Sequence, residues 1–199
     1  MPISIGIDFD NTIVSYEGVF HSVAFERNLI PADLSFSKGA IRDYFRSIGK
    51  EELWTELQGY VYGAKMDSAH PYPTALSFFA LCVEKKISTY IISHKTRHPY
   101  LGHPYDLHQS AKEWLKGHGF LAPAFFELTL EAKFKRIEQQ KCEVFIDDLP
   151  EVLEHADFPK GIRRILFNPH LRSQPSDHYE SVNHWEDVIK ILQLNQMKR

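Results

Sequence analysis

Short apolar runs, typical of buried strands, alternate along the chain with longer stretches in which apolar residues have helical spacing. Met1 to Ile7 carries isoleucine at positions 3, 5 and 7, which suits a buried central strand. Further strands are predicted at 87–92, 143–146 and 164–167, and helices at 73–86, 107–118, 130–140 and 184–194. This alternation predicts an α/β fold with a three-layer, Rossmann-like parallel sheet.

The helix at 73–86 shows the spacing most clearly. Leu76, Phe79, Ala80 and Val83 fall at i, i+3, i+4 and i+7, which predicts that they form one apolar face.

Residues 15–69 interrupt this pattern with three predicted helices, near 17–28, 37–48 and 51–62. The first strand needs partners that only come later in the chain, so we interpret this block as a small helical cap inserted after the first strand. The core is then predicted at 1–14 and 70–199, ending in a polar tail at 195–199. The alternative is that these helices pack directly on the sheet.

Composition narrows the class of protein. With 199 residues and 43% apolar residues, the chain suits one domain with a modest insertion. A net charge of -3 argues against nucleic acid as a partner. No apolar stretch approaches the ~20 residues of a membrane span, and Met1 leads straight into a strand, so we expect a cytoplasmic protein, monomeric or homodimeric. Cys82 and Cys142 are expected to be buried free thiols.

The candidate chemistry begins directly after the first strand, where Asp8, Asp10 and Thr12 form a D-x-D-x-T motif. Open α/β sheets bind ligands at the carboxyl ends of their strands. Two carboxylates at a buried edge are costly unless a cation or hydrogen-bond donors hold them. The motif therefore indicates a catalytic or metal-binding loop, against the alternative of a solvated turn.

Three further polar sites follow predicted strands or precede them. Ser93 ends the strand at 87–92, and Asp147 and Asp148 end the strand at 143–146. Two carboxylate pairs at one sheet edge suit a hard cation such as Mg²⁺. Lys133, or its competitor Lys135, lies on the helix before the second pair, where an ammonium group could neutralise a phosphate or a carboxylate.

In this order, the motifs resemble those of the haloacid dehalogenase (HAD) superfamily, in its Mg²⁺-dependent phosphatase branch with a small helical (C1-type) cap. The resemblance implies that Asp8 is the nucleophile that becomes an aspartyl phosphate, and that Asp10 is the general acid and base. It also implies that Thr12 shapes the catalytic loop, that Ser93 binds phosphate, and that Lys133 stabilises the transferring group.

The same resemblance implies a Mg²⁺ site. Asp8 and the backbone carbonyl of Asp10 would bind the ion with Asp148, and Asp147 would bind it through water or hold Lys133. The repulsion between a carboxylate nucleophile and a phosphate dianion makes such a cation necessary.

We therefore expect a phosphatase that hydrolyses a phosphate monoester of a small metabolite, such as a sugar phosphate. A phosphomutase or phosphotransferase with the same nucleophile is the alternative, and a non-catalytic binding module is a third. Members of the superfamily that remove halogen lack an acid two residues after the nucleophile, so Asp10 favours phosphoryl transfer.

The segment that follows Ser93 is rich in histidine, with four between residues 94 and 108. Their spacing matches no common zinc motif, and no cysteine lies near them. We predict instead that His94, Lys95 and Arg97 bind the substrate, in a loop over the catalytic crevice. The alternative is an exposed loop with solvated histidines.

Overall fold

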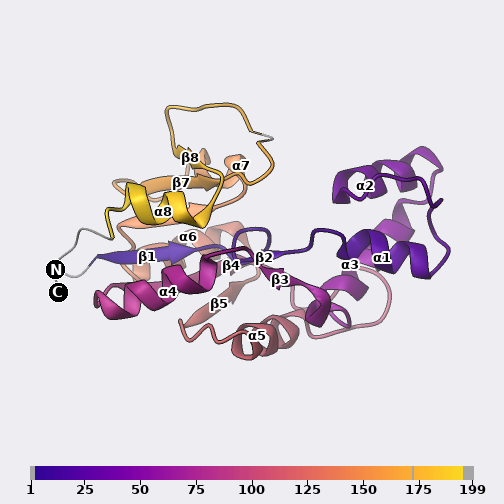
Figure 1. The fold of residues 1–199 in the computed structure, drawn as a ribbon, viewed down its shortest axis with the longest axis horizontal. Helices are drawn as coiled ribbons and strands as arrows, with labels where there is room; N and C mark the ends of the chain where they lie inside the picture. Colours follow the sequence, from indigo (N-terminus) through magenta and orange to yellow (C-terminus); the bar gives the residue numbers. More distant parts are fainter. Residues whose placement is uncertain (1–2, 172, 195–199) are drawn as a thin grey trace. The chain divides into compact units, whose positions relative to one another are not determined.

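The first strand of the chain lies inside a six-stranded, all-parallel sheet in the computed structural model, which describes residues 3–171 and 173–194 (Figure 1). The strand order is β5 (Ala124–Glu127), β4 (Ser88–His94), β1 (Ser4–Ile7), β6 (Val144–Asp147), β7 (Arg163–Phe167) and β8 (Glu180–Val182). The predicted parallel α/β sheet is therefore confirmed, with a helical insertion after β1.

The register of the central strands brings their carboxyl ends together. Ile7 pairs with Ile91 of β4 and with Ile146 of β6. The next residue, Asp8, donates its backbone N–H to the carbonyl of Ile146 over 2.8 Å. Asp8 and the carboxylates that follow Ile146 consequently share one edge of the sheet.

Helices cover both faces of this sheet (Figure 1). On one face, Trp185 of α8 (Trp185–Ile191) packs against Phe78 of α4 (Ala75–Glu84) and Phe167 of β7, with ring centroids 4.8 and 5.6 Å apart. On the other, α6 (Leu130–Gln139) and α7 (Pro150–Leu153) enclose a buried cluster that includes Phe134, Phe145 and Leu166. The three-layer arrangement follows from strands that are apolar on both sides.

The predicted apolar face of the 73–86 helix is wrong. The buried positions of α4 are Ala75, Phe78, Phe79 and Cys82, whereas Leu76 and Val83 are 43% and 71% exposed. The helix is apolar almost all round, so residue spacing alone could not identify which side packs on the sheet. The predicted stripe instead lines a groove of about 550 Å³ together with residues of β4 and the segment before β5.

The other predicted helices are present, with ends that shift by a few residues. They are α1 (Val19–Glu26), α2 (Lys38–Ser47), α3 (Glu51–Tyr62) and α5 (Leu107–Gly117), together with α6 and α8. The 3-10 turn η1 (Met66–Ser68) was not predicted, and neither was a second sheet formed by β2 (Val14–Ser15) and β3 (His70–Pro71). The predicted polar tail at 195–199 lies outside the described residues.

Two compact units divide the described chain. The sheet unit comprises the described residues of Met1–Val14, Pro71–Lys95 and Gly119–Arg199, and the helical unit comprises Ser15–His70 and Thr96–His118. In the helical unit, Phe20 packs against Trp54 and Tyr62 with ring centroids 5.2 and 5.7 Å apart. The predicted division into a cap at 15–69 and a core at 1–14 and 70–199 stays a prediction.

Residues 96–106, the loop after β4, pack on α3 within the helical unit. A side chain at Gly59 would place its Cβ 2.6 Å from Pro99, and one at Gly63 would lie 2.4 Å from the ring of Tyr105. The loop closes on itself, since the backbone N–H of Leu107 donates to the carbonyl of Arg97 over 2.9 Å. This close packing explains why the two segments of the helical unit belong together.

Both cysteines are free and buried, as predicted. Among the residues that the structure describes, no helix has the length and apolar composition needed to cross a membrane.

Candidate active site

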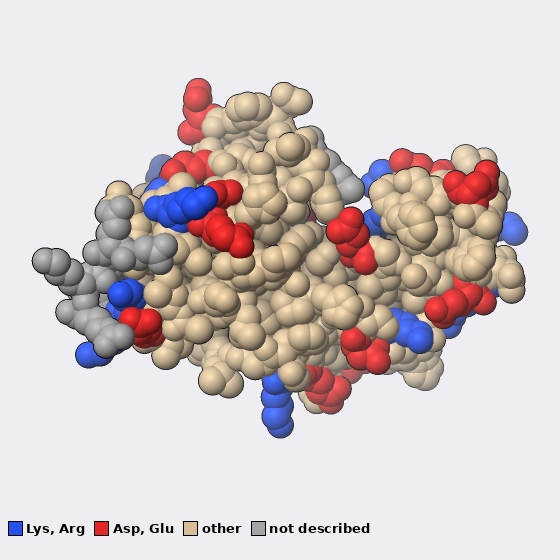
Figure 2. All heavy atoms as spheres, viewed as in Figure 1, with Lys and Arg blue, Asp and Glu red and all other residues tan. Residues whose placement is uncertain are grey.

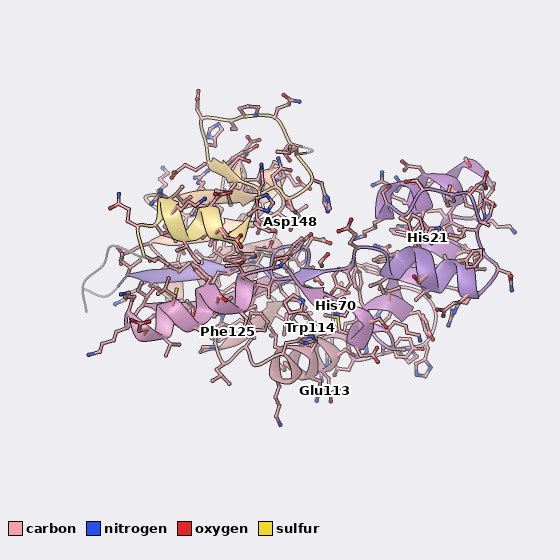
Figure 3. All side chains as sticks on the ribbon, viewed as in Figure 1. His21, His70, Glu113, Trp114, Phe125 and Asp148 are labelled. Carbon is pink, nitrogen blue, oxygen red and sulfur yellow. The ribbon has the colours of Figure 1, made fainter. Side chains whose placement is uncertain are left out.

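Three carboxylates meet at the carboxyl edge of the sheet. Asp8 after β1, and Asp147 and Asp148 at the end of β6, each place one oxygen within 4.8 Å of the others. Asp8 and Asp147 are buried, whereas Asp148, labelled in Figure 3, is half-buried. We call these three residues the acidic cluster.

Lys133 supplies a positive charge inside this cluster. Its ammonium group donates to Oδ1 of Asp8 and to Oδ2 of Asp147, each over 2.6 Å, and its side chain is only 2% exposed. Lys135 is exposed, so Lys133 is the lysine that contacts the carboxylates. The sequence contained a signal for this choice, because Lys133 is spaced three and four residues from Leu130 and Ile137, on the apolar side of α6.

Burial and the neighbouring charges together set the protonation of Asp8 and Lys133. Burial raises the pKa of Asp8 from 3.8 to about 7, against the opposing effect of the Lys133 ammonium group, and the neighbouring carboxylates of Asp147 and Asp10 raise it further. Burial alone would lower the pKa of Lys133, but Asp147 and Asp8 outweigh it and raise that pKa above its ordinary value. Lys133 therefore stays charged.

Hydrogen bonds fix the remaining carboxylates. Oδ1 of Asp147 accepts the backbone N–H of Leu149 over 3.0 Å, so both oxygens of Asp147 have a donor. Thr12 donates its hydroxyl to Oδ1 of Asp148 over 3.4 Å. Asp147 thus holds Lys133, which is one of the two roles expected for it.

The loop after β1 is a tight turn that carries Asp10 and Thr12. The backbone N–H of Ile13 donates to the carbonyl of Phe9 over 3.0 Å, and Asn11 adopts a left-handed φ of 57°. Asparagine tolerates this conformation better than most residues. Thr12 is fully buried, and its carbonyl accepts the indole N–H of Trp185 over 3.1 Å. The position of Thr12 suits the predicted role of shaping this loop.

Asp10 has a partner that the sequence did not indicate. The ammonium group of Lys95 lies 3.0 and 2.8 Å from the two oxygens of Asp10. We had expected Lys95 among the residues that bind the substrate. A signal for the pairing was available, since Lys95 follows Ser93 by two residues and therefore continues on the same side of the strand.

The other predicted substrate-binding residues have different surroundings. Ser93 is buried in β4, in register with Phe126 of β5. His94 is exposed, with Nε2 3.2 Å from the carbonyl of Leu128. Arg97 belongs to the helical unit and forms an ion pair with Asp106 over 3.0 Å. Substrate binding by Ser93, His94 and Arg97 stays a prediction.

The acidic cluster suits a divalent cation. Its donors are all carboxylate oxygens, the ligands that Mg²⁺ prefers. Adding Asp10, Lys95 and Lys133 to the cluster gives four carboxylates and two ammonium groups, whose formal charge is two negative units. One Mg²⁺ would neutralise that charge, and it would favour the ionised form of Asp8.

Within the described ranges, the acidic cluster is the only group of three or more His, Cys, Asp or Glu side chains placed to hold a metal ion. The histidines between residues 94 and 108 form no such group. His98 instead lies with Nδ1 3.1 Å from the carbonyl of Tyr105.

Comparison with known proteins identifies the fold. No protein-family profile and no curated protein sequence matches the chain. Solved structures do match over nearly its whole length. One is the Bacillus subtilis protein YfnB, described as a HAD-hydrolase bound to magnesium, with 15% identity, a TM-score of 0.57 and coverage of 96% of this chain and 98% of that one.

Two other structures show that the fold serves different chemistry. A predicted phosphoglycolate phosphatase from Haemophilus somnus matches with 13% identity, a TM-score of 0.61, and coverage of 96% and 98%. The L-2-haloacid dehalogenase of Xanthobacter autotrophicus matches with 11% identity, a TM-score of 0.60, and coverage of 97% and 99%. The chain therefore has the fold of HAD-superfamily hydrolases, and its reaction has to be argued from its own residues.

Proposed function

We propose that this protein is a Mg²⁺-dependent phosphatase that hydrolyses a phosphate monoester of a small metabolite through an aspartyl phosphate on Asp8. The observation that carries the proposal is the setting of Asp8. Its carboxylate contacts the buried Lys133 over 2.6 Å, it lies in a cluster with Asp147 and Asp148, and a second acid follows two residues later.

In the first half of the proposed reaction, a carboxylate oxygen of Asp8 attacks phosphorus. A bond forms between that oxygen and phosphorus, and the bond from phosphorus to the ester oxygen breaks. Asp10 gives a proton to the departing oxygen, so the product leaves as an alcohol. Asp8 needs no base to activate it in its ionised form.

In the second half, Asp10 removes a proton from water. The resulting hydroxide attacks phosphorus, the bond between phosphorus and Asp8 breaks, and inorganic phosphate departs. Asp10 regains the proton that it gave away in the first half, so the protein returns to its starting state.

Lys133 offsets the negative charge that would otherwise keep Asp8 and a phosphate dianion apart. Asp147 holds it in place over 2.6 Å. The chemistry that Mg²⁺ supplies, when bound by Asp8, Asp148 and the carbonyl of Asp10, is neutralisation of the charge on the phosphate oxygens. Ser93 is proposed as a further contact to those oxygens.

Asp10 favours this reaction over the dehalogenation found in the same fold. A halide leaves as an anion and requires neither a proton nor a metal ion, so a dehalogenase has no use for Asp10. A non-catalytic module would not need the complete set of Asp8, Asp10, Lys133 and Asp148. A phosphomutase or phosphotransferase would use the same residues and differs only in where the phosphate goes.

A small substrate agrees with the charge of the protein. The net charge is -3, and Figure 2 shows the described Lys and Arg side chains dispersed among acidic ones on the face in view, without a continuous basic patch. A long polyanion would gain little from binding to that face. A compact phosphate ester needs only the local positive charges of the site.

The test is release of inorganic phosphate from a panel of sugar phosphates, nucleoside monophosphates and p-nitrophenyl phosphate. We expect release with Mg²⁺, none with EDTA, recovery when Mg²⁺ is returned, and at least a ~1,000-fold loss of kcat in Asp8→Asn, because that variant keeps the shape and removes the nucleophile. The matched control is Asp177→Asn, a change at an exposed aspartate, which should leave activity unchanged.

Two results would contradict the proposal. Asp8→Asn as active as the natural protein would exclude Asp8 as the nucleophile. Phosphorus NMR showing phosphate transferred to a second hydroxyl, with none released, would identify a mutase or phosphotransferase.

A further inference from the structure

Lys95 contacts both carboxylate oxygens of Asp10, the proposed acid and base. Its ammonium group lies 3.0 Å from Oδ1 and 2.8 Å from Oδ2 of Asp10. The side chain of Lys95 is only 4% exposed, whereas that of Asp10 is 21% exposed. Asp10 is thus the partner that solvent reaches, and the ammonium group is the buried one.

Lys95 is itself held in place from more than one side. Its backbone N–H donates to the carbonyl of Glu127 over 2.9 Å, which extends the pairing between β4 and β5 by one residue. Its ammonium group lies 5.7 Å from the ring centre of Phe9, and that ring packs edge-on against Phe126, with centroids 5.5 Å apart. The charge that meets Asp10 is therefore fixed by the sheet.

A carboxylate that transfers protons works best in one orientation. The side chain of a half-exposed aspartate can rotate about χ1 and sample several staggered positions. A buried ammonium group that binds both of its oxygens restricts that rotation.

We propose that Lys95 is a positioning residue, which holds the carboxylate of Asp10 in the orientation for proton transfer with the leaving oxygen. This inference rests on the proposed function for the role of Asp10, but the contact itself does not depend on it. It replaces our expectation that Lys95 binds the substrate.

The first test measures the side chain of Asp10 directly, by NMR of the full-length protein. We expect a single χ1 rotamer of Asp10 in the natural protein and averaging among rotamers in Lys95→Met, which keeps the apolar stem and removes the charge. Lys95→Arg keeps a cation and should retain most of the order, so it serves if the methionine variant folds poorly. An unchanged single rotamer in Lys95→Met, the variant without the charge, would overturn the proposal.

The second test uses two esters of similar size with different leaving groups. The leaving group of benzyl phosphate is a poorly stabilised alkoxide, so its departure depends on a proton from the general acid. The p-nitrophenolate leaving group is a stable anion, so its departure depends on that proton much less. We expect Lys95→Met to lower kcat at least ~10-fold for benzyl phosphate and less than ~3-fold for p-nitrophenyl phosphate. The larger loss is a part of the roughly 100- to 10,000-fold that general acid catalysis contributes. KM should change little for either ester.

A double-mutant cycle completes the design. In an Asp10→Asn background, Lys95→Met should cause no further loss of kcat, because its effect acts through Asp10. Lys135→Met is the matched control, since that lysine is exposed, and should match the natural protein.

The outcomes separate the two proposals. A raised KM with unchanged kcat would overturn the positioning role and make Lys95 a substrate-binding residue, and additive losses in the cycle would also overturn it. A natural protein that releases no phosphate from any ester would contradict the proposed function, whereas the rotamer measurement would still decide the role of Lys95.

Discussion

Asp8 illustrates how one residue's surroundings set its chemistry. It is buried, it contacts the ammonium group of Lys133, and it lies close to Asp147 and Asp148. Burial raises its pKa to about 7 in the absence of a metal ion. A group that must be ionised to attack phosphorus is therefore held near the point where it loses its charge, and a cation at the cluster would favour the ionised form.

We expect the metal-free protein to lose stability as pH rises. The unfolded chain releases the proton of Asp8 near its ordinary pKa of 3.8, and the folded chain keeps it until about 7. Below pH 4 both states hold the proton, so this group has no effect there. Between about 4 and 7 the folded state binds more protons, so its free energy of unfolding falls with rising pH.

Urea unfolding in EDTA, at pH 5 and pH 7.5, measures this effect. The natural protein should lose about 1 to 3 kcal/mol relative to Asp8→Asn over that interval, since each unit of pKa difference is worth about 1.4 kcal/mol. Asp8→Asn is the control, because it keeps the shape and cannot titrate. Two parallel pH profiles would contradict the raised pKa.

At the scale of single residues, the sequence identified which residues belong to the site better than it identified their contacts. Asp8, Asp147 and Asp148 were predicted to meet because they follow neighbouring strands, and the structure brings them together. The pairing of Lys95 with Asp10 was not predicted, although the two-residue spacing of Lys95 from Ser93 indicates the same side of the strand. The spacing gives the side of the strand, but the partner of Lys95 depends on the path of the neighbouring loop.

At the scale of elements, the packing of the 96–106 loop on helix α3 determines which residues α3 and its end can carry. Gly59 and Gly63 leave the space that Pro99 and the ring of Tyr105 occupy. Neither glycine has the left-handed φ that would explain its presence by conformation. Close packing is therefore the reason for glycine at position 59 within α3 and at position 63 directly after it.

Gly63→Ala and Gly59→Ala should each destabilise the protein by about 1 to 3 kcal/mol, because the added methyl group would overlap Tyr105 or Pro99. Thermal unfolding measures the loss. Hydrogen exchange should become faster in the 96–106 loop and in α3, because the loss of stability is expected there.

Gly39→Ala, near the start of α2, provides the matched control. Nothing lies within 4 Å of the position that its Cβ would take. The change should be neutral or stabilising by up to about 1 kcal/mol, since alanine is the better helix former. Equal losses at all three glycines would show that contact with the loop is not the cause.

The helices and strands that could be predicted from the sequence are those with enough buried residues to show a hydrophobic period. The central strands β1, β4 and β6 and the amphipathic α6 were found from their patterns. The edge strand β5 was missed, because its four residues are all half-buried and show no alternation. The strand at the opposite edge of the sheet, β8, has three residues and is too short to give a pattern.

At the scale of the whole molecule, a bound cation should be visible as added stability. The site carries two formal negative charges in excess, and ligands that bind only the folded state raise its stability by mass action. At 100 times its Kd, Mg²⁺ should add about 2.7 kcal/mol and raise Tm by roughly 5 to 10 °C for a chain of this size.

Differential scanning fluorimetry with Mg²⁺ and with EDTA checks this expectation. Asp148→Asn should lose most of the shift, and K⁺ at matched ionic strength should cause little of it. A shift of equal size in Asp148→Asn would contradict a site at the acidic cluster.

The helical unit is built from two separate segments of the chain, and this constrains its exchange between related proteins. It draws on residues 15–70 and on residues 96–118, and the second part fits the first through the space left at Gly59 and Gly63. A chimera that transplants only the longer segment would set a foreign helix against the native Tyr105. Recombination would therefore have to carry both segments, which makes them one unit of inheritance although α4 and β4 separate them in the sequence.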